Sequence, residues 1–187
     1  MKNTIIMKPK IFLAVILALP VIAAAQDTKT IYDFKAKTID GNEFDFSSLK
    51  GKKILIVNTA SKCGNTPQYK DLEDLYKTYG GDKFVIIGFP ANNFLRQEPG
   101  SNDSIKAFCT KNYGVTFQMM SKISVKGDSI DPIYKWLTSK SQNGVMDAPV
   151  TWNFQKFMID ENGQIVGMVP PKENPKCDKI INWIKGQ

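Results

Sequence analysis

The chain has 187 residues, no histidine, and 25 lysine and arginine residues against 18 aspartate and glutamate residues. The length suits one domain with a sizeable core, and the lack of histidine excludes Cys-His nucleophile pairs, Ser-His-Asp triads and histidine-ligated metal sites. The lysines are scattered and form no arginine–aromatic stripe, which indicates a solvated surface and no nucleic-acid partner.

The N-terminal segment has the pattern of a secretory signal. Lysines precede an apolar run over residues 11–25, which contains Pro20 and ends in three alanines. The run is shorter than the about 20 residues that a membrane-spanning helix needs. We therefore expect residues 1–25 to be a signal peptide and residues 26–187 to be exported, periplasmic or secreted, without stable membrane insertion. An uncleaved N-terminal anchor is the alternative.

Two apolar runs predict buried strands with a helix between them. Lys53–Asn58 and Phe84–Phe89 are short and almost continuously apolar, which is typical of strands buried on both faces. Thr66–Tyr79 places aromatic and leucine side chains at helical spacing, with Pro67 suited to its first turn and Gly80 to its end. This strand-helix-strand unit predicts a parallel pair of strands.

Further elements are predicted on both sides of this unit. Tyr32–Phe46 alternates around Asp40, Gly41 and Asn42, which favours a hairpin. The elements expected later are a helix over 102–112, a strand over 115–120, a helix opened by Asp131 and Pro132, a hairpin of 152–160 and 164–169, and a helix over 174–185. The order predicts one α/β domain that resembles the thioredoxin-like fold, with a central mixed sheet flanked by helices and an N-terminal β-hairpin.

Cys63 is the first candidate for chemistry. It follows one predicted buried strand and lies just before the predicted helix, where the helix dipole and unpaired N–H groups favour a thiolate. Cys109 and Cys177 are the other cysteines, and Thr66 stands where a Cys-x-x-Cys motif has its second thiol. Three cysteines suit one working pair and one spare thiol, although a lone thiol is often only a small core residue.

Amide and indole groups follow other strand ends. Gln97 lies in the loop after the second buried strand, and Trp152 and Asn153 open the second hairpin. Loops at the carboxyl ends of strands converge in α/β sheets, and these N–H groups can stabilise a thiolate that attacks a peroxide and becomes a sulfenic acid. The alternatives are a loop hydrogen-bonding role for Gln97, core packing for Trp152 and a turn role for Asn153.

Four ordered motifs resemble those of the glutathione peroxidase family, over about Ile31 to Ile184. They are residues 58–64, residues 88–94 with 97–101, residues 113–117 and residues 152–157. The resemblance implies a thioredoxin-like antioxidant enzyme that reduces hydrogen peroxide and organic or lipid hydroperoxides with thiols and needs no cofactor or metal. It places the catalytic tetrad on Cys63, Gln97, Trp152 and Asn153.

The resemblance also implies how the enzyme is regenerated. Cys109 matches the resolving cysteine of cysteine-type relatives, which predicts a Cys63–Cys109 disulfide reduced by a thioredoxin-type protein or by glutathione. Cys177 matches no motif. The short segment Ser139–Val150 favours a monomer. The main alternative is a peroxide sensor or redox relay that passes oxidation to a partner protein; Thr66 argues against a thiol-disulfide oxidoreductase, and the residue types make a metal chaperone remote.

Overall fold

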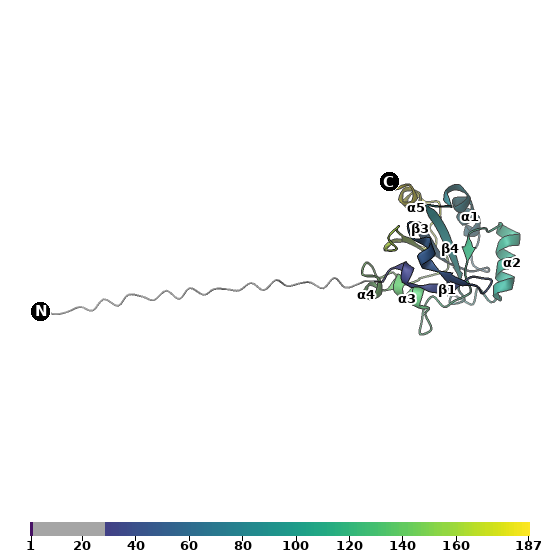
Figure 1. Ribbon diagram of the computed structural model, residues 1–187. Coiled ribbons are helices and arrows are strands. Elements are labelled where there is room, and N and C mark those ends of the chain that lie inside the picture. The colour runs from purple at the N-terminus through teal and green to yellow at the C-terminus, as the bar shows by residue number, and fades with distance from the viewer. Residues whose placement is uncertain (2–28) are drawn as a thin grey trace.

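The computed structural model describes Met1 and residues 29–187, drawn in colour in Figure 1. All but the first residue of the predicted signal peptide, residues 1–25, lies outside the described residues. Within residues 29–187, no helix combines the length and the apolar character needed to cross a bilayer.

Two sheets and the helices around them make up the described part of the chain. The strands are β1 (Lys35–Lys37), β2 (Glu43–Asp45), β3 (Lys53–Thr59), β4 (Phe84–Pro90), β5 (Gln118–Met119), β6 (Lys156–Ile159) and β7 (Ile165–Val169). The helices are α1 (Gln68–Tyr79), α2 (Asn102–Tyr113), α3 (Pro132–Thr138), α4 (Lys140–Asn143) and α5 (Asp178–Lys185), with short 3-10 helices η1 (Ile31–Asp33) and η2 (Phe46–Leu49). Strands β1 and β2 pair antiparallel as the predicted N-terminal hairpin, and the larger sheet has the order β5-β4-β3-β6-β7.

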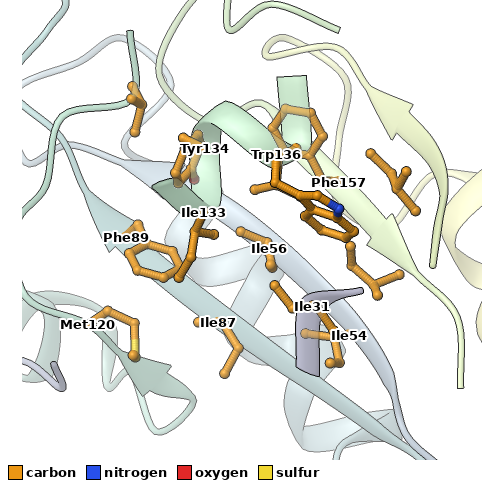
Figure 2. Packing of buried hydrophobic residues seen from close by; sticks show 14 of the residues in the cluster. Ile31, Ile54, Ile56, Ile87, Phe89, Met120, Ile133, Tyr134, Trp136 and Phe157 are labelled. Carbon is orange, nitrogen blue, oxygen red and sulfur yellow. The ribbon is translucent and has the colours of Figure 1, made fainter. Parts of the chain in front are cut away.

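The central strand β3 is buried on both faces of the larger sheet. It pairs parallel with β4, as predicted, and antiparallel with β6. Its side chains alternate, so that Ile54 and Ile56 enter one core cluster and Leu55 and Val57 the other. Figure 2 shows the first cluster, in which Ile54 and Ile56 gather with Trp136 of α3. Each fully buried side chain of this kind contributes roughly 1.5–3 kcal/mol, which explains why β3 is the centre of the fold.

Helices α1, α2 and α5 cover the second face of the sheet, and α3 covers the first (Figure 1). The side chains buried on the second face are Tyr69, Leu72 and Leu75 from α1, Ile105 and Cys109 from α2, and Ile180 from α5. The result is a three-layer α/β arrangement, which agrees with the predicted fold class.

Several element boundaries differ from the sequence prediction for tertiary reasons. The strand expected over 115–120 is only β5, because the Thr116 N–H and hydroxyl donate to the buried Glu73 carboxylate at 2.8 and 2.6 Å. The second hairpin begins at Lys156, and the last helix begins at Asp178 instead of residue 174. Helix α4 also forms within the short segment Ser139–Val150, where the sequence predicts no helix.

The strand directions bring four connections to one edge of the sheet. Strands β3, β4 and β7 end there, whereas the antiparallel β6 begins there. The connections that meet are therefore residues 60–67, 91–101, 152–155 and 170–177. This edge carries all four residues of the predicted tetrad.

Candidate active site

Cys63 lies in a tight turn between β3 and α1. The Asn65 N–H donates to the Cys63 sulfur at 3.3 Å, and the side chain is 8% exposed. Thr66 fastens the turn, because its hydroxyl accepts from the Cys63 N–H at 2.9 Å and donates to the Ala60 carbonyl at 2.8 Å. Helix α1 begins at Gln68, slightly later than predicted, so the N–H that reaches the sulfur belongs to the turn and not to the first helical turn.

The loop after β4 presses Gln97 against this turn. Its carbonyl accepts from the Lys62 N–H at 3.0 Å. The two preceding residues, Leu95 and Arg96, have left-handed φ values of 48° and 52°. Such a conformation costs roughly 1–2 kcal/mol per non-glycine residue, and it persists because the surrounding contacts fix the loop. Backbone strain is therefore concentrated next to Gln97.

Asn153 is completely buried and contacts Gln97 directly. Its Nδ2 donates to Gln97 Oε1 at 2.9 Å, and its carbonyl accepts from Asn65 Nδ2 at 3.3 Å. Its Oδ1 is buried without a hydrogen-bond partner among the described residues. Phe154, the next residue, has a left-handed φ of 71°. Asn153 is thus held from both sides and leaves one polar atom for a further group.

Trp152 is half-buried and packs against Phe94, with ring centroids 5.3 Å apart. The buried Asn58 side chain positions this segment, because its Nδ2 donates to the Trp152 carbonyl at 3.1 Å and its Oδ1 accepts from the Gln155 N–H at 3.1 Å. These bonds explain why residues 152–155 form a turn and not the start of β6. This role of Asn58 is not predicted above, although a polar residue inside an apolar strand is a signal for it.

The structure therefore connects the four predicted residues by different routes. Gln97 and Asn153 share a direct hydrogen bond, and the Cys63 turn contacts both through Lys62 and Asn65. Trp152 lines an open cavity of about 570 Å³, which residues of the Cys63 turn also line. The size of this cavity is typical of small-molecule sites. The cavity is lined largely by apolar atoms of Gly64, Asn65, Thr151, Trp152, Pro170, Pro171 and Lys172.

Cys109 has very different surroundings. It lies in α2, is 1% exposed, and packs in the same core cluster as Cys63. Burial raises the pKa of the Cys109 thiol to about 11, and the Glu98 carboxylate acts in the same direction. The buried Tyr69 hydroxyl lies near the Cys109 thiol and opposes this rise, and the buried Thr59 hydroxyl lies next to Tyr69. All three cysteines are free thiols in the structure, and Cys177 precedes α5 at the N-cap position without a side-chain capping hydrogen bond.

A second, smaller cavity separates the Cys63 turn from α2. Its volume is about 270 Å³, and Ser61 and Lys62 line one side while Ile105 and Phe108 line the other. Glu98 also lines this cavity; the Ser61 hydroxyl donates to its carboxylate at 3.0 Å, and burial raises the pKa of that carboxyl. Among residues 29–187, no cluster of cysteine and acidic side chains has the grouping needed to hold a metal ion.

Comparison with known proteins bears on both fold and family. Residues 31–138 match the family profile described as glutathione peroxidase. The glutathione peroxidase-like peroxiredoxin gpx1 of Schizosaccharomyces pombe is 53% identical over 135 residues, which cover 72% of this chain and 85% of that relative. The matched profile range includes Cys63, Gln97 and Cys109, whereas Trp152 and Asn153 lie beyond it.

Solved structures show the same likeness. The crystal structure of Trgpx in apo form is 40% identical with a TM-score of 0.65 and covers 84% of this chain and 97% of that chain. A thiol:disulfide interchange protein of the thioredoxin family from Chlorobium tepidum TLS is 21% identical with a TM-score of 0.60, covering 86% and 99%. The second likeness concerns the fold alone and confirms the predicted thioredoxin-like architecture.

Proposed function

This chain belongs to the glutathione peroxidase family and is a thiol peroxidase, and from that membership we propose that Cys63 is its peroxide-reacting thiol. Its substrates are hydrogen peroxide and organic or lipid hydroperoxides. The observation that carries the proposal is the hydrogen bond between Asn153 and Gln97, both of them tied to the turn that holds Cys63.

The first step is attack of the Cys63 thiolate on one peroxide oxygen. The O–O bond breaks, the sulfur keeps one oxygen as a sulfenic acid, and the other oxygen leaves as an alkoxide or hydroxide that takes a proton from solvent. Gln97, Trp152 and Asn153 supply N–H donors for the negative charge that develops during this step. The unpaired Oδ1 of Asn153 is an acceptor for a substrate O–H group.

The cavity beside Trp152 supports the proposal of organic substrates. It adjoins the Cys63 turn through Gly64 and Asn65, and its largely apolar wall includes Pro170 and Pro171. A hydroperoxide whose reacting oxygens reach Cys63 can bury its hydrocarbon part there, at about 0.8 kcal/mol per buried CH₂. Hydrogen peroxide needs no such contact.

Cys109 is the proposed resolving cysteine. Its thiol attacks the sulfur of the Cys63 sulfenic acid, which forms a disulfide and releases water. A buried thiol with a pKa of about 11 is a poor nucleophile near neutral pH, so the proposal includes an opening of α2 that exposes this thiol to water before it attacks. A thioredoxin-type dithiol then reduces the disulfide, with glutathione as the second candidate. A relative named as a peroxiredoxin supports the first reductant.

The remaining proposals concern where and in what form the enzyme works. The basic and apolar pattern of residues 1–25 supports export to the periplasm or beyond, and the short segment after α3 supports a monomer. Mass spectrometry of the mature N-terminus tests the first, with cleavage near Ala25 expected. Sedimentation of the purified domain tests the second.

Treatment of the reduced protein with hydrogen peroxide or tert-butyl hydroperoxide, followed by mass spectrometry, tests the proposed nucleophile. Oxidation should appear first on Cys63, and Cys63→Ser should lower the rate of peroxide consumption by at least about a thousandfold. Cys177→Ser is the matched control and should retain wild-type activity. Peroxide consumption that leaves Cys63 unmodified would overturn the proposal, and a single turnover in the presence of thioredoxin would favour the redox relay.

A further inference from the structure

Lys156 is a lysine buried completely beneath the candidate site. It is the first residue of β6, and its Nζ donates to the carbonyls of Pro170, Pro171 and Glu173 at 3.4, 3.3 and 2.5 Å. None of the carboxylates in the described part of the chain lies within ion-pair distance of it. Burying a charge without a counter-charge is costly. The three carbonyls around this ammonium therefore indicate that it has a functional or structural role at this position.

The Pro171 carbonyl oxygen indicates this role, because three side chains donate hydrogen bonds to it. Besides Lys156, this oxygen accepts from Gln68 Nε2 at 2.7 Å and from Asn65 Nδ2 at 3.4 Å. Asn65 is also the residue whose N–H reaches the Cys63 sulfur and whose side chain contacts Asn153. Three hydrogen bonds, through the Pro171 carbonyl and Asn65, therefore connect Lys156 to the reacting sulfur.

We propose that Lys156 is a positioning residue of the peroxidase site: its ammonium holds segment 170–173 in place so that Asn65 keeps its hydrogen bond to the Cys63 sulfur. The inference rests on the proposed role of Cys63 as nucleophile. Segment 170–173 also forms a wall of the cavity beside Trp152, so the same ammonium maintains the shape of the proposed substrate site.

The protonation state of Lys156 makes this role testable. Burial lowers the pKa of Lys156 to about 8, and negative charge at Cys177 and Glu173 opposes this shift. Its cross-strand neighbours Val57 on β3 and Val169 on β7 are apolar. A neutral amine has two N–H donors for three carbonyls, so segment 170–173 loses one hydrogen bond and the charge as the pH rises through 8.

Stability and positioning respond to this deprotonation in opposite directions. An unfolded lysine keeps its proton up to about pH 10.4. Between pH 8 and that value the unfolded state binds more protons than the native state, so the contribution of Lys156 to the free energy of unfolding rises with pH. The rate of Cys63 oxidation should fall over the same interval relative to a variant that keeps its charge at residue 156. A merely structural lysine would not produce this divergence.

The experiment measures the second-order rate constant for oxidation of fully reduced protein by hydrogen peroxide, from pH 7 to 9.5. Lys156→Arg keeps its charge throughout, so the ratio of its rate constant to that of wild type cancels effects common to both proteins, including ionisation of the reacting thiol. We expect this ratio to rise with a midpoint near pH 8. Lys156→Met should oxidise about tenfold more slowly than wild type at pH 7.

Lys53→Met is the matched control. Lys53 also donates to backbone carbonyls, those of Trp183 and Ile184 at 2.5 and 3.3 Å, but it lies at the opposite end of β3. Lys53→Met should lower the melting temperature and leave the oxidation rate unchanged. The inference would be overturned if the ratio of the Lys156→Arg oxidation rate constant to that of wild type did not change with pH. It would also be overturned if Lys156→Met folded and oxidised at the wild-type rate. If Lys156→Met does not fold, the pH dependence of the Lys156→Arg to wild-type ratio tests the inference by itself. Failure of the proposed function would appear separately, as peroxide turnover by Cys63→Ser.

Discussion

The Cys63 turn and helix α2 each place a thiol in one core cluster, but they prepare those thiols for different events. Cys63 has a backbone N–H on its sulfur, and its turn opens onto a cavity. Cys109 lies inside a regular helix, where burial raises the pKa of its thiol to about 11. The difference teaches that the folded structure already arranges the groups for the proposed first step, whereas the proposed second step needs movement of one element.

Helices α1 and α2 differ in how firmly they are held. Along α1 the buried side chains are Tyr69, Leu72, Glu73 and Leu75, whereas α2 buries only Ile105 and Cys109. Less buried apolar area means a smaller free energy for local opening. Of these two helices, α2 is therefore the one that we expect to leave the sheet in the proposed resolving step.

Replacing Cys109 by serine should separate the two steps most completely. The first oxidation of Cys63 should proceed at the wild-type rate, because Cys109 takes no part in it, while turnover supported by a thioredoxin-type protein should fall to background. Stopped-flow oxidation and coupled turnover assays measure the two quantities. Cys177→Ser serves as the control and should keep both. Undiminished thioredoxin-supported turnover in Cys109→Ser would remove Cys109 from the cycle.

Replacing Asn153 by alanine should damage the first step alone. Loss of one preorganised donor for developing negative charge lowers a rate about a hundredfold or more, and we expect this for Cys63 oxidation measured by stopped flow. Asn143→Ala is a matched control, because Asn143 is also buried and donates to the carbonyls of Trp136 and Met146 near α4. Equal oxidation rates for Asn153→Ala and Asn143→Ala would show that Asn153 is only structural.

Much of the fold around the Cys63 turn could be predicted from local sequence signals. The apolar runs around Ile56 and Ile87 are long enough to predict β3 and β4, and the turn at Gly41 predicts the β1–β2 hairpin. These signals are local, because apolar pattern and turn chemistry act over a few residues. The order of strands and loops then places Cys63 and Gln97 at the same sheet edge.

The parts that the sequence did not predict depend on contacts between distant segments. Residues 152–155 leave the expected strand because Asn58 bonds to them from β3. Asn65 bridges Cys63, Asn153 and Pro171, and no spacing rule indicates such a bridge. Nor does the sequence distinguish the buried Lys156 from the many exposed lysines, since its burial follows from the β3 and β7 strands on either side.

Replacing Ile105 by alanine should make the second step faster while making the protein less stable. Removal of a buried isoleucine costs about 2–5 kcal/mol, and much of this loss falls on the docking of α2. Disulfide formation after a peroxide pulse should therefore accelerate by about tenfold, which is 1.4 kcal/mol of the lost docking free energy. Ile133→Ala on α3 makes the same change on the other face and should lower the melting temperature without this acceleration. Slower disulfide formation in Ile105→Ala would indicate that α2 must stay docked for the thiols to react.

The pH dependence of disulfide formation gives the smallest effect and distinguishes an opened helix from a docked one. If Cys109 attacked from its place in α2, the rate would keep rising toward its pKa of about 11 in the folded structure. If α2 opens first, and the exposed thiol with its pKa of about 8.5 attacks faster than the helix closes again, opening limits the rate. The rate should then change by less than about twofold above pH 9.5. Quenched-flow alkylation of the remaining thiols after a peroxide pulse measures this rate. A plateau above pH 9.5 means that opening of α2 limits the rate, because the exposed thiol is then already ionised; a rate that keeps rising to a midpoint near 11 would place the attack inside the folded core.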